Sequence, residues 1–318
     1  MLRRALLTLS LALVPALASA QDWPQRPVRM IIPFAAGGVT DMVGRVVGQE
    51  LSRRLGQPVV AENRVGAGGN IGADVCAKAT DGYTICMGTI SSHAINPSIY
   101  PRMPFDNLRD FAPIALLGQQ PNALVVANAL PVRSVQDLVA YMKARPGQLN
   151  YGSSGVGTST HLAGELLTQQ TGTDAVHVPY RSSAQLVTDI LAGQLPMSFD
   201  NFSSVFPHAR EGRMRMLAVG SAQRWPAAPD VPTVAETLPG FESLSWHGLF
   251  APASMPRPAV ERLTRETVAA LQSPDVVTRF NDVGIAPGTL SGDAFRDFVA
   301  AETRRWGEVA RRANIRAE

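Results

Sequence analysis

Short apolar runs alternate with helical stripes along the first third of the chain. Residues 28–34 form a run typical of a strand, and two glycines follow it. A stripe of apolar residues at helical spacing comes next: Val43, Val46, Val47, Leu51 and Leu55. Further strands are expected over residues 59–62 and 83–87, with a glycine-rich turn and a helix between them. This alternation predicts a parallel sheet flanked by helices.

The same alternation starts again after about residue 120. Strands are expected over residues 124–127, 149–152, 176–178, 197–199 and 214–219. Helices are expected over residues 134–145, around 162–167 and over 182–191. A proline-rich connection spans residues 222–239, and helical patterns over 259–271 and 293–313 close the chain. The pattern therefore predicts an α/β protein with two units.

The N-terminus has the pattern of a secretory signal peptide. Arg3 and Arg4 precede a short apolar run, and Ala18-Ser19-Ala20 supplies a small-residue cleavage site. We expect cleavage after Ala20 and export to the periplasm. Removing both arginines leaves 27 basic and 26 acidic residues, a net charge of +1. This balance argues against a nucleic-acid partner, and no later segment is long and apolar enough to cross a membrane.

Cysteine and histidine give little sign of metal chemistry. Cys76 and Cys86 fall in a predicted helix and the next strand. We expect two buried free thiols, and a disulfide, which export permits, is the alternative. The five histidines show no metal-ligand spacing, so structural roles are expected, with neither a metal nor a cofactor.

Two glycine-bearing loops carry the candidate binding chemistry. Each lies between a predicted strand and a helix, where backbone N–H groups and the helix dipole attract anions. The candidate residues in the first loop are Phe34, Ala36, Gly37, Gly38, Thr40 and Asp41, and those in the second are Ser153, Ser154, Gly157 and Thr158. An ordinary capped strand-to-helix turn is the alternative in each case. Asp41 and Asp200 have the same ambiguity between ligand contact and helix cap.

Enzyme motifs are incomplete in this chain. Val156 occupies the last glycine position of G-x-S-x-G, and Ile71 occupies the third glycine position of G-x-G-x-x-G. A triad of Ser154, His161 and an acid would make an exported serine hydrolase, which is the less favoured alternative. We therefore expect no catalytic residues.

An ordered set of motifs resembles the substrate-binding receptors of tripartite tricarboxylate transporters, also called Bug receptors. The matching segments are residues 33–41 with Arg45, 62–69, 81–84, 96–97, 110–113, 151–157, 161–165, 177–180, 229–236, 246–248, 251–252 and 302–306. They span nearly the whole of the chain after the signal peptide. The set is more specific than any one of its members.

The resemblance implies a two-lobed, Venus-flytrap periplasmic binding protein of type II-like fold, each lobe a mainly parallel sheet flanked by helices. The expected division of the chain is a signal peptide over residues 1–20, lobe 1 over 21–121 and 222–318, and lobe 2 over 122–221. The expected ligand is a small carboxylate: a di- or tricarboxylate, an acidic amino acid or an aromatic acid. Membrane transporter subunits are the expected protein partners, and the receptor is expected to be a monomer.

Ser92, Ser182 and Asp200 are further candidate ligand-binding residues. Three positions depart from the family pattern. Ala36 and Gln185 stand where proline is usual, and Ser182 replaces a common glycine. These departures bear on the ligand rather than on the fold. A sensor or scavenger without its own transporter is the alternative function.

Overall fold

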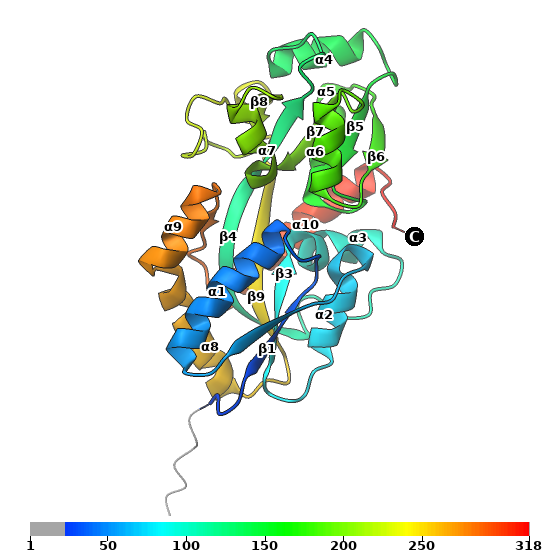
Figure 1. Ribbon diagram of the computed structural model, residues 1–318. Coiled ribbons are helices and arrows are strands. Elements are labelled where there is room, and N and C mark those ends of the chain that lie inside the picture. The colour runs from blue at the N-terminus through cyan, green and yellow to red at the C-terminus, as the bar shows by residue number, and fades with distance from the viewer. Residues whose placement is uncertain (1–22, 318) are drawn as a thin grey trace, which may run out of the picture.

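The computed structural model describes residues 23–317. The signal peptide expected over residues 1–20, with its cleavage after Ala20, lies outside the described residues. Figure 1 shows two α/β units joined by the long central strands β4 and β9. Across residues 23–317, no helix combines the length and the apolar character that spanning a membrane requires.

The first unit contains both ends of the described chain. Its sheet has the order β2-β1-β3-β9-β4, in which β1, β2 and β3 are parallel and β9 is antiparallel to both of its neighbours. Its strands are β1 (Val28–Ile32), β2 (Val59–Asn63), β3 (Thr84–Thr89), β9 (Leu244–Pro252), β10 (Ala286–Pro287) and the first part of β4 (Phe111–Val126). Its helices are α1 (Val39–Leu55), η1 (Ala67–Gly69), α2 (Asn70–Ala77), η2 (Ser91–Ile95), α3 (Asn96–Ile99), α8 (Arg257–Leu271), α9 (Pro274–Asp282) and α10 (Gly292–Arg312).

The second unit is built on the other end of β4. There β4 pairs antiparallel with β7 and β8, while β7, β5 and β6 are parallel. Its strands are β5 (Asn150–Ser153), β6 (Val176–Pro179), β7 (Met197–Asn201) and β8 (Arg215–Val219). Its helices are α4 (Val135–Lys143), α5 (Ser159–Thr171), α6 (Ser183–Leu191), α7 (Phe202–Arg210) and η3 (Val234–Glu236).

Both faces of each sheet are covered, as parallel sheets require. In the first unit, Met30 and Ile32 of β1 pack into the core under α1 and α8, while Ile31 packs into the core under α2 and α10. In the second unit, Leu124 lies in the core with α4 and α5, whereas Ala123 lies in the core with α6 and α7. Alternate residues of one strand thus serve opposite cores.

The chain passes between the units twice. Strand β4 pairs with β9 as far as Pro121 and with β7 from Asn122 onward. The return is near Ser243, whose backbone bonds Asn122 and Gly220. Residues 222–239, which the sequence analysis assigns to lobe 1, place Val234 in the core of the second unit. We therefore propose to draw the second lobe boundary at Ser243 rather than at residue 222.

The expectation of two free thiols is wrong. Cys76 of α2 and Cys86 of β3 form a disulfide, with 6.0 Å between their Cα atoms. Helix α2 packs against β3, so the two residues meet within the range that a disulfide bridges. Both cysteines are fully buried in the core that α2 shares with α10.

Candidate ligand-binding site

The first glycine loop connects β1 to α1 and ends in a helix without a side-chain cap. Phe34 is half-buried, whereas Ala36, Gly37 and Gly38 are exposed. Gly37 has a φ of +81°, a conformation that favours glycine. Gly38 is the N-cap residue of α1, and no side chain accepts from the first-turn N–H groups. The start of α1 is therefore an open set of donors at the positive end of the helix dipole.

Asp41 holds this loop in shape. Its carboxylate accepts hydrogen bonds from the Gly37 N–H (3.0 Å), Arg45 Nε (2.9 Å) and Asn63 Nδ2 (2.9 Å). Burial raises the pKa of Asp41, but these hydrogen bonds outweigh it and leave the pKa below its usual value. Both carboxylate oxygens bond groups of the protein itself, so Asp41 holds the loop to α1 and β2.

Thr40, Phe34 and Ser92 line the base of the first loop. Thr40 Oγ1 lies 3.2 Å from Nε2 of His247, a buried residue of β9. Phe34 and Ser92 both approach Gly69, where a Cβ atom would lie 3.3 Å from the Phe34 ring and 3.2 Å from Ser92 Cβ. The Ser92 hydroxyl bonds the Thr89 N–H and His93, so Ser92 acts within the first unit.

The second loop, residues 153–160, is held by its own hydroxyl groups. The Ser154 hydroxyl lies 3.0 Å from Thr160 Oγ1, and Thr158 Oγ1 lies 2.9 Å from the same oxygen. Thr158 is the N-cap of α5 and accepts from the His161 N–H. This helix start therefore has a cap of its own, unlike the start of α1.

Two stacked histidines lie behind the second loop. The rings of His161 and His177 are 3.7 Å apart between centroids. His177 Nε2 contacts Ser153 Oγ at 2.7 Å, and His161 Nδ1 accepts from the Gly157 N–H at 3.2 Å. Burial lowers the pKa of His161 to about 3 and that of His177 to about 4. Both rings are neutral at pH 7, and they fix Ser153 and Gly157 in place.

The second loop meets the first unit across the boundary between the units. A Cβ atom on Gly157 would lie 2.2 Å from Ile99 Cδ1 and 3.4 Å from Asn96 Oδ1. Asn96 in turn donates to the Gly68 carbonyl at 3.0 Å. The second loop thus packs directly on α3 and, through Asn96, on η1 of the first unit. The two units are therefore in contact at this point.

Asp200 and Ser182 lie at the start of the adjoining helices of the second unit. Asp200 is fully buried at the end of β7, and its Oδ2 has no hydrogen-bond partner. Burial raises the pKa of Asp200 to about 6. Ser182 is exposed, and its hydroxyl caps α6 by accepting from the Gln185 N–H. Oδ2 of Asp200 is therefore free to accept a hydrogen bond from a ligand, whereas the Ser182 hydroxyl caps α6.

Several buried polar groups that the sequence analysis did not name lack a partner. They are Nε2 of Gln120, Oδ1 of Asn201, Oγ of Ser203 and Nδ1 of His247. An unpaired buried polar group costs about 1–3 kcal/mol of stability. Gln120 of β4 stands next to Gln119 and Pro121, and His247 of β9 stands between Trp246 and Gly248. Neither sequence context marks its residue as a member of a binding site.

The serine hydrolase alternative has no support in this geometry. His161, its expected base, uses Nδ1 to accept from the Gly157 N–H, and its Nε2 lies 3.7 Å from Glu165. The Ser154 hydroxyl is instead bonded to Thr160. Among residues 23–317, no three acidic, histidine or cysteine side chains are grouped to hold a metal ion.

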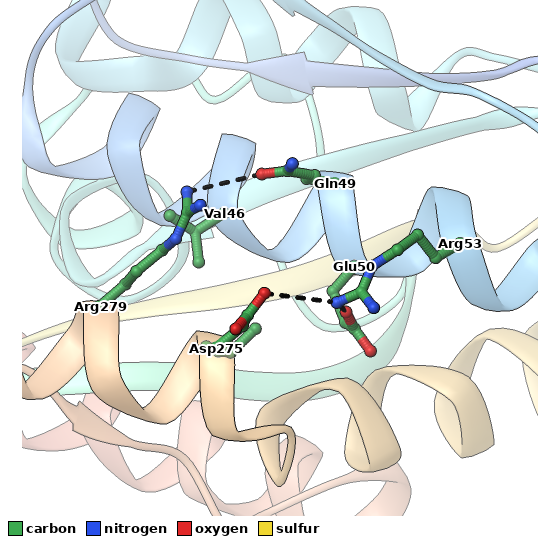
Figure 2. A pocket seen from close by; sticks show the side chains of 7 residues that line it. Val46, Gln49, Glu50, Arg53, Asp275 and Arg279 are labelled. Carbon is green, nitrogen blue, oxygen red and sulfur yellow. Dashed lines mark hydrogen bonds and ion pairs between the residues drawn. The ribbon is translucent and has the colours of Figure 1, made fainter.

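A small surface pocket between α1 and α9 is separate from these loops. Figure 2 shows its lining, with Arg53 facing Asp275 and Arg279 facing Gln49. Its volume of about 10 Å³ is close to the space that a single water molecule needs. It is too small for an organic acid, so the candidate site remains the region where the two units meet.

The fold and the site together define a two-lobed binding protein whose ligand lies between the lobes. The model of the family described as "Tripartite tricarboxylate transporter family receptor" matches residues 43–315. The chain belongs to this family. The predicted family and the predicted α/β periplasmic binding protein fold are both confirmed.

Relatives and solved structures agree with this assignment. Protein BugT of Bordetella pertussis is 38% identical over 301 residues, covering 94% of this chain and 92% of BugT. The structure of Rpa4515 from R. palustris with adipate has a TM-score of 0.87 and 39% identity, covering 93% of this chain and 99% of that one. MatC from Rhodopseudomonas palustris with bound malate has a TM-score of 0.83 and 32% identity, covering 90% of this chain and 99% of that one.

Proposed function

We propose that this chain captures a small carboxylate between its two units in the periplasm and presents it to membrane transporter subunits. The observation that carries the proposal is the uncapped start of α1, with Gly37 and Gly38 exposed beside it. Backbone N–H groups there bind an anion without a basic side chain. The adipate and malate held by similar receptors have the chemistry that such a site favours.

The proposed mechanism is binding and closure without catalysis. A ligand carboxylate at the start of α1 is enclosed when the second loop packs on α3, and the closed state is favoured because only it contacts the ligand from both units. Asp41, Arg45 and Asn63 keep the first loop in shape. The receptor acts as an exported monomer, with its signal peptide removed.

A panel of acids tests this function. Isothermal titration is carried out with mono-, di- and tricarboxylates, acidic amino acids and aromatic acids, and with the neutral amide of each. We expect at least one acid to bind and its amide to bind far more weakly. Binding of neutral compounds alone, or of nothing in the panel, would refute the carboxylate proposal.

Two substitutions at one position test where the carboxylate binds. Gly38 has φ −80° and ψ 170°, which any residue adopts, so Gly38→Asn and Gly38→Asp are both sterically allowed. Asparagine caps the helix without charge, while aspartate places a carboxylate where the ligand should bind. We expect Gly38→Asp to weaken binding at least tenfold more than Gly38→Asn. Equal effects of the two substitutions would place the ligand elsewhere.

A further inference from the structure

Four buried polar atoms without partners gather where β4 enters the second unit. They belong to what we call the junction cluster: Gln120, Asp200, Asn201 and Ser203. Gln120 and Asp200 have no solvent exposure. Buried polar groups in folded proteins are nearly always bonded. Water or a ligand is needed to complete these hydrogen bonds.

Hydrogen bonds from backbone N–H groups link these residues in two pairs. Gln120 Oε1 accepts from the Ser203 N–H at 2.9 Å, and Asp200 Oδ1 accepts from the Asn201 N–H at 2.7 Å. Asp200 and Asn201 end β7, where they lie opposite Ala123 and Asn122 of β4. The junction cluster therefore occupies the meeting point of β4, β7 and the first turn of α7.

Asp200 and Gln120, the two fully buried members of the junction cluster, are each held by one polar atom of the side chain. The other polar atom of each side chain has no partner. Asp200 Oδ1 accepts from Ser183 Oγ at 2.7 Å as well as from the Asn201 N–H, which holds the carboxylate and leaves Oδ2 free. The Gln120 amide is held through its oxygen, which leaves its NH₂ group free. Such preorganised groups match a ligand better than groups that a ligand must first order.

The chemistry of the free atoms specifies the ligand group. Asp200 Oδ2 and Asn201 Oδ1 are acceptors, Gln120 Nε2 is a donor, and the Ser203 hydroxyl is both. A carboxylate alone would satisfy the donors but would leave Asp200 facing another negative charge. A group that donates a hydrogen bond satisfies Asp200 Oδ2, and an oxygen next to it accepts from Gln120 Nε2.

Resting on the proposed function, we propose that the junction cluster recognises a hydroxyl or ammonium substituent on the carboxylate ligand, through a hydrogen bond that Asp200 Oδ2 accepts. Strand β4 carries Gln120 between the two units, so this substituent lies beside the interface that closure seals. The start of α1 then binds the carboxylate, and the junction cluster selects among carboxylates.

Titration with matched acids tests the proposal. Succinate, malate and aspartate share one four-carbon diacid skeleton. Succinate has no substituent on it, malate has a hydroxyl group and aspartate has an ammonium group. Glutarate, 2-hydroxyglutarate and glutamate form a second series. We expect a substituted acid to bind at least tenfold more tightly than its parent, and the two substituted members of a series show which donor is preferred.

The variant Asp200→Asn inverts the chemistry of the free atom. Because the Asn201 N–H needs an acceptor, the amide oxygen takes the place of Oδ1 and the NH₂ group replaces Oδ2. We expect this variant to lose at least tenfold in affinity for the substituted acid, with less than a threefold change for the parent. Asp189→Asn is the matched control, since Asp189 lies on α6 and bonds Tyr180 instead. It should keep the selectivity.

The outcomes separate this inference from the function on which it rests. If no acid of either series or of the wider panel binds, the proposed function fails and the inference fails with it. If parent and substituted acids bind equally, or if Asp200→Asn weakens both to the same degree, the receptor function stands and the inference is wrong. Near-UV circular dichroism of each variant verifies that the fold is retained.

Discussion

The ionised carboxylate of Asp200 should destabilise the ligand-free protein, and Asp200→Asn should reveal by how much. Asp200 is fully buried, with one oxygen unpaired. Burial raises its pKa from an ordinary 3.8 to about 6. The amide variant retains the acceptor that Ser183 and the Asn201 N–H require, and it cannot ionise. The substitution therefore removes a buried charge with little change in shape.

The pKa shift sets the size and sign of the effect. A difference of about two pKa units corresponds to about 3 kcal/mol. Between pH 4 and 6 the folded wild type holds a proton at Asp200 that the unfolded chain has lost, so its stability falls as pH rises through this window. The side-chain amide of Asp200→Asn does not ionise, so the variant does not lose stability in this way. The stability of Asp200→Asn relative to wild type should therefore rise by up to about 3 kcal/mol between pH 4 and 7.

Urea unfolding of the ligand-free proteins, followed by circular dichroism from pH 4 to 8, measures this difference. Asp137→Asn is an informative control, because hydrogen bonds from the Arg133 N–H and from Ser134 hold the pKa of Asp137 below its usual value. Wild type gains stability from Asp137 as pH rises, so the relative stability of that variant should change in the opposite direction. A difference for Asp200→Asn that is flat or falls with pH would refute the reasoning.

Three other features give direct tests. Gly157→Ala should weaken ligand binding at least tenfold in titrations, because its Cβ would lie 2.2 Å from Ile99 Cδ1 across the contact between the units. Gly172→Ala has similar backbone strain and no contact within 4 Å, so equal effects of the two variants would contradict this. Replacing both disulfide cysteines by serine should lower the free energy of unfolding by about 3 kcal/mol, measured with urea, because the disulfide closes a loop with a sequence separation of 10. An unchanged free energy of unfolding would contradict this. Burial lowers the pKa of His93 to about 3, so the stability of the wild type should fall as pH drops below 6.5. The thermal midpoint of the wild type should fall more steeply with pH than that of His93→Asn, and equal slopes for the two proteins would contradict this.

Local patterns predicted the elements whose signals lie within one segment. The apolar stripe of α1 fits a helix that ends at Gly56, which adopts the left-handed conformation of a C-cap. The two glycine loops were also recognisable, because each separates a strand from a helix start. These features depend on helical spacing and on glycine conformation, which the sequence expresses directly.

The strands that join the units could not be predicted in this way. The sequence indicated a strand over residues 124–127, whereas β4 runs from Phe111 to Val126 and includes Gly118 and Pro121. Glycine and proline ordinarily interrupt strands. Strand β9, which the pattern did not reveal, pairs with β4 across more than one hundred residues of chain. Pairing at that distance, rather than local preference, determines both strands.

The candidate residues show the same division between local and distant information. The sequence analysis proposed Asp41, Ser92 and Ser153 as ligand-binding residues, but it could not show which atoms their side chains would bond. The structure directs Asp41 to Arg45, Ser92 to His93 and Ser153 to His177. Gln120 became a candidate only because its amide is buried with one end unpaired. Such a deficit is visible only after all partners are placed.

The distribution of unpaired groups links ligand chemistry to closure. Helices α5 and α6 are capped by their own Thr158 and Ser182, whereas the start of α1 has no side-chain cap and the junction cluster lacks partners. The start of α1 belongs to the first unit, whereas Asp200, Asn201 and Ser203 of the junction cluster belong to the second. A ligand that satisfies both therefore stabilises the closed state over the open one, and a ligand can shift that equilibrium only by its differential affinity for the two states. A carboxylate without a donor satisfies only the first set fully and should close the receptor less completely.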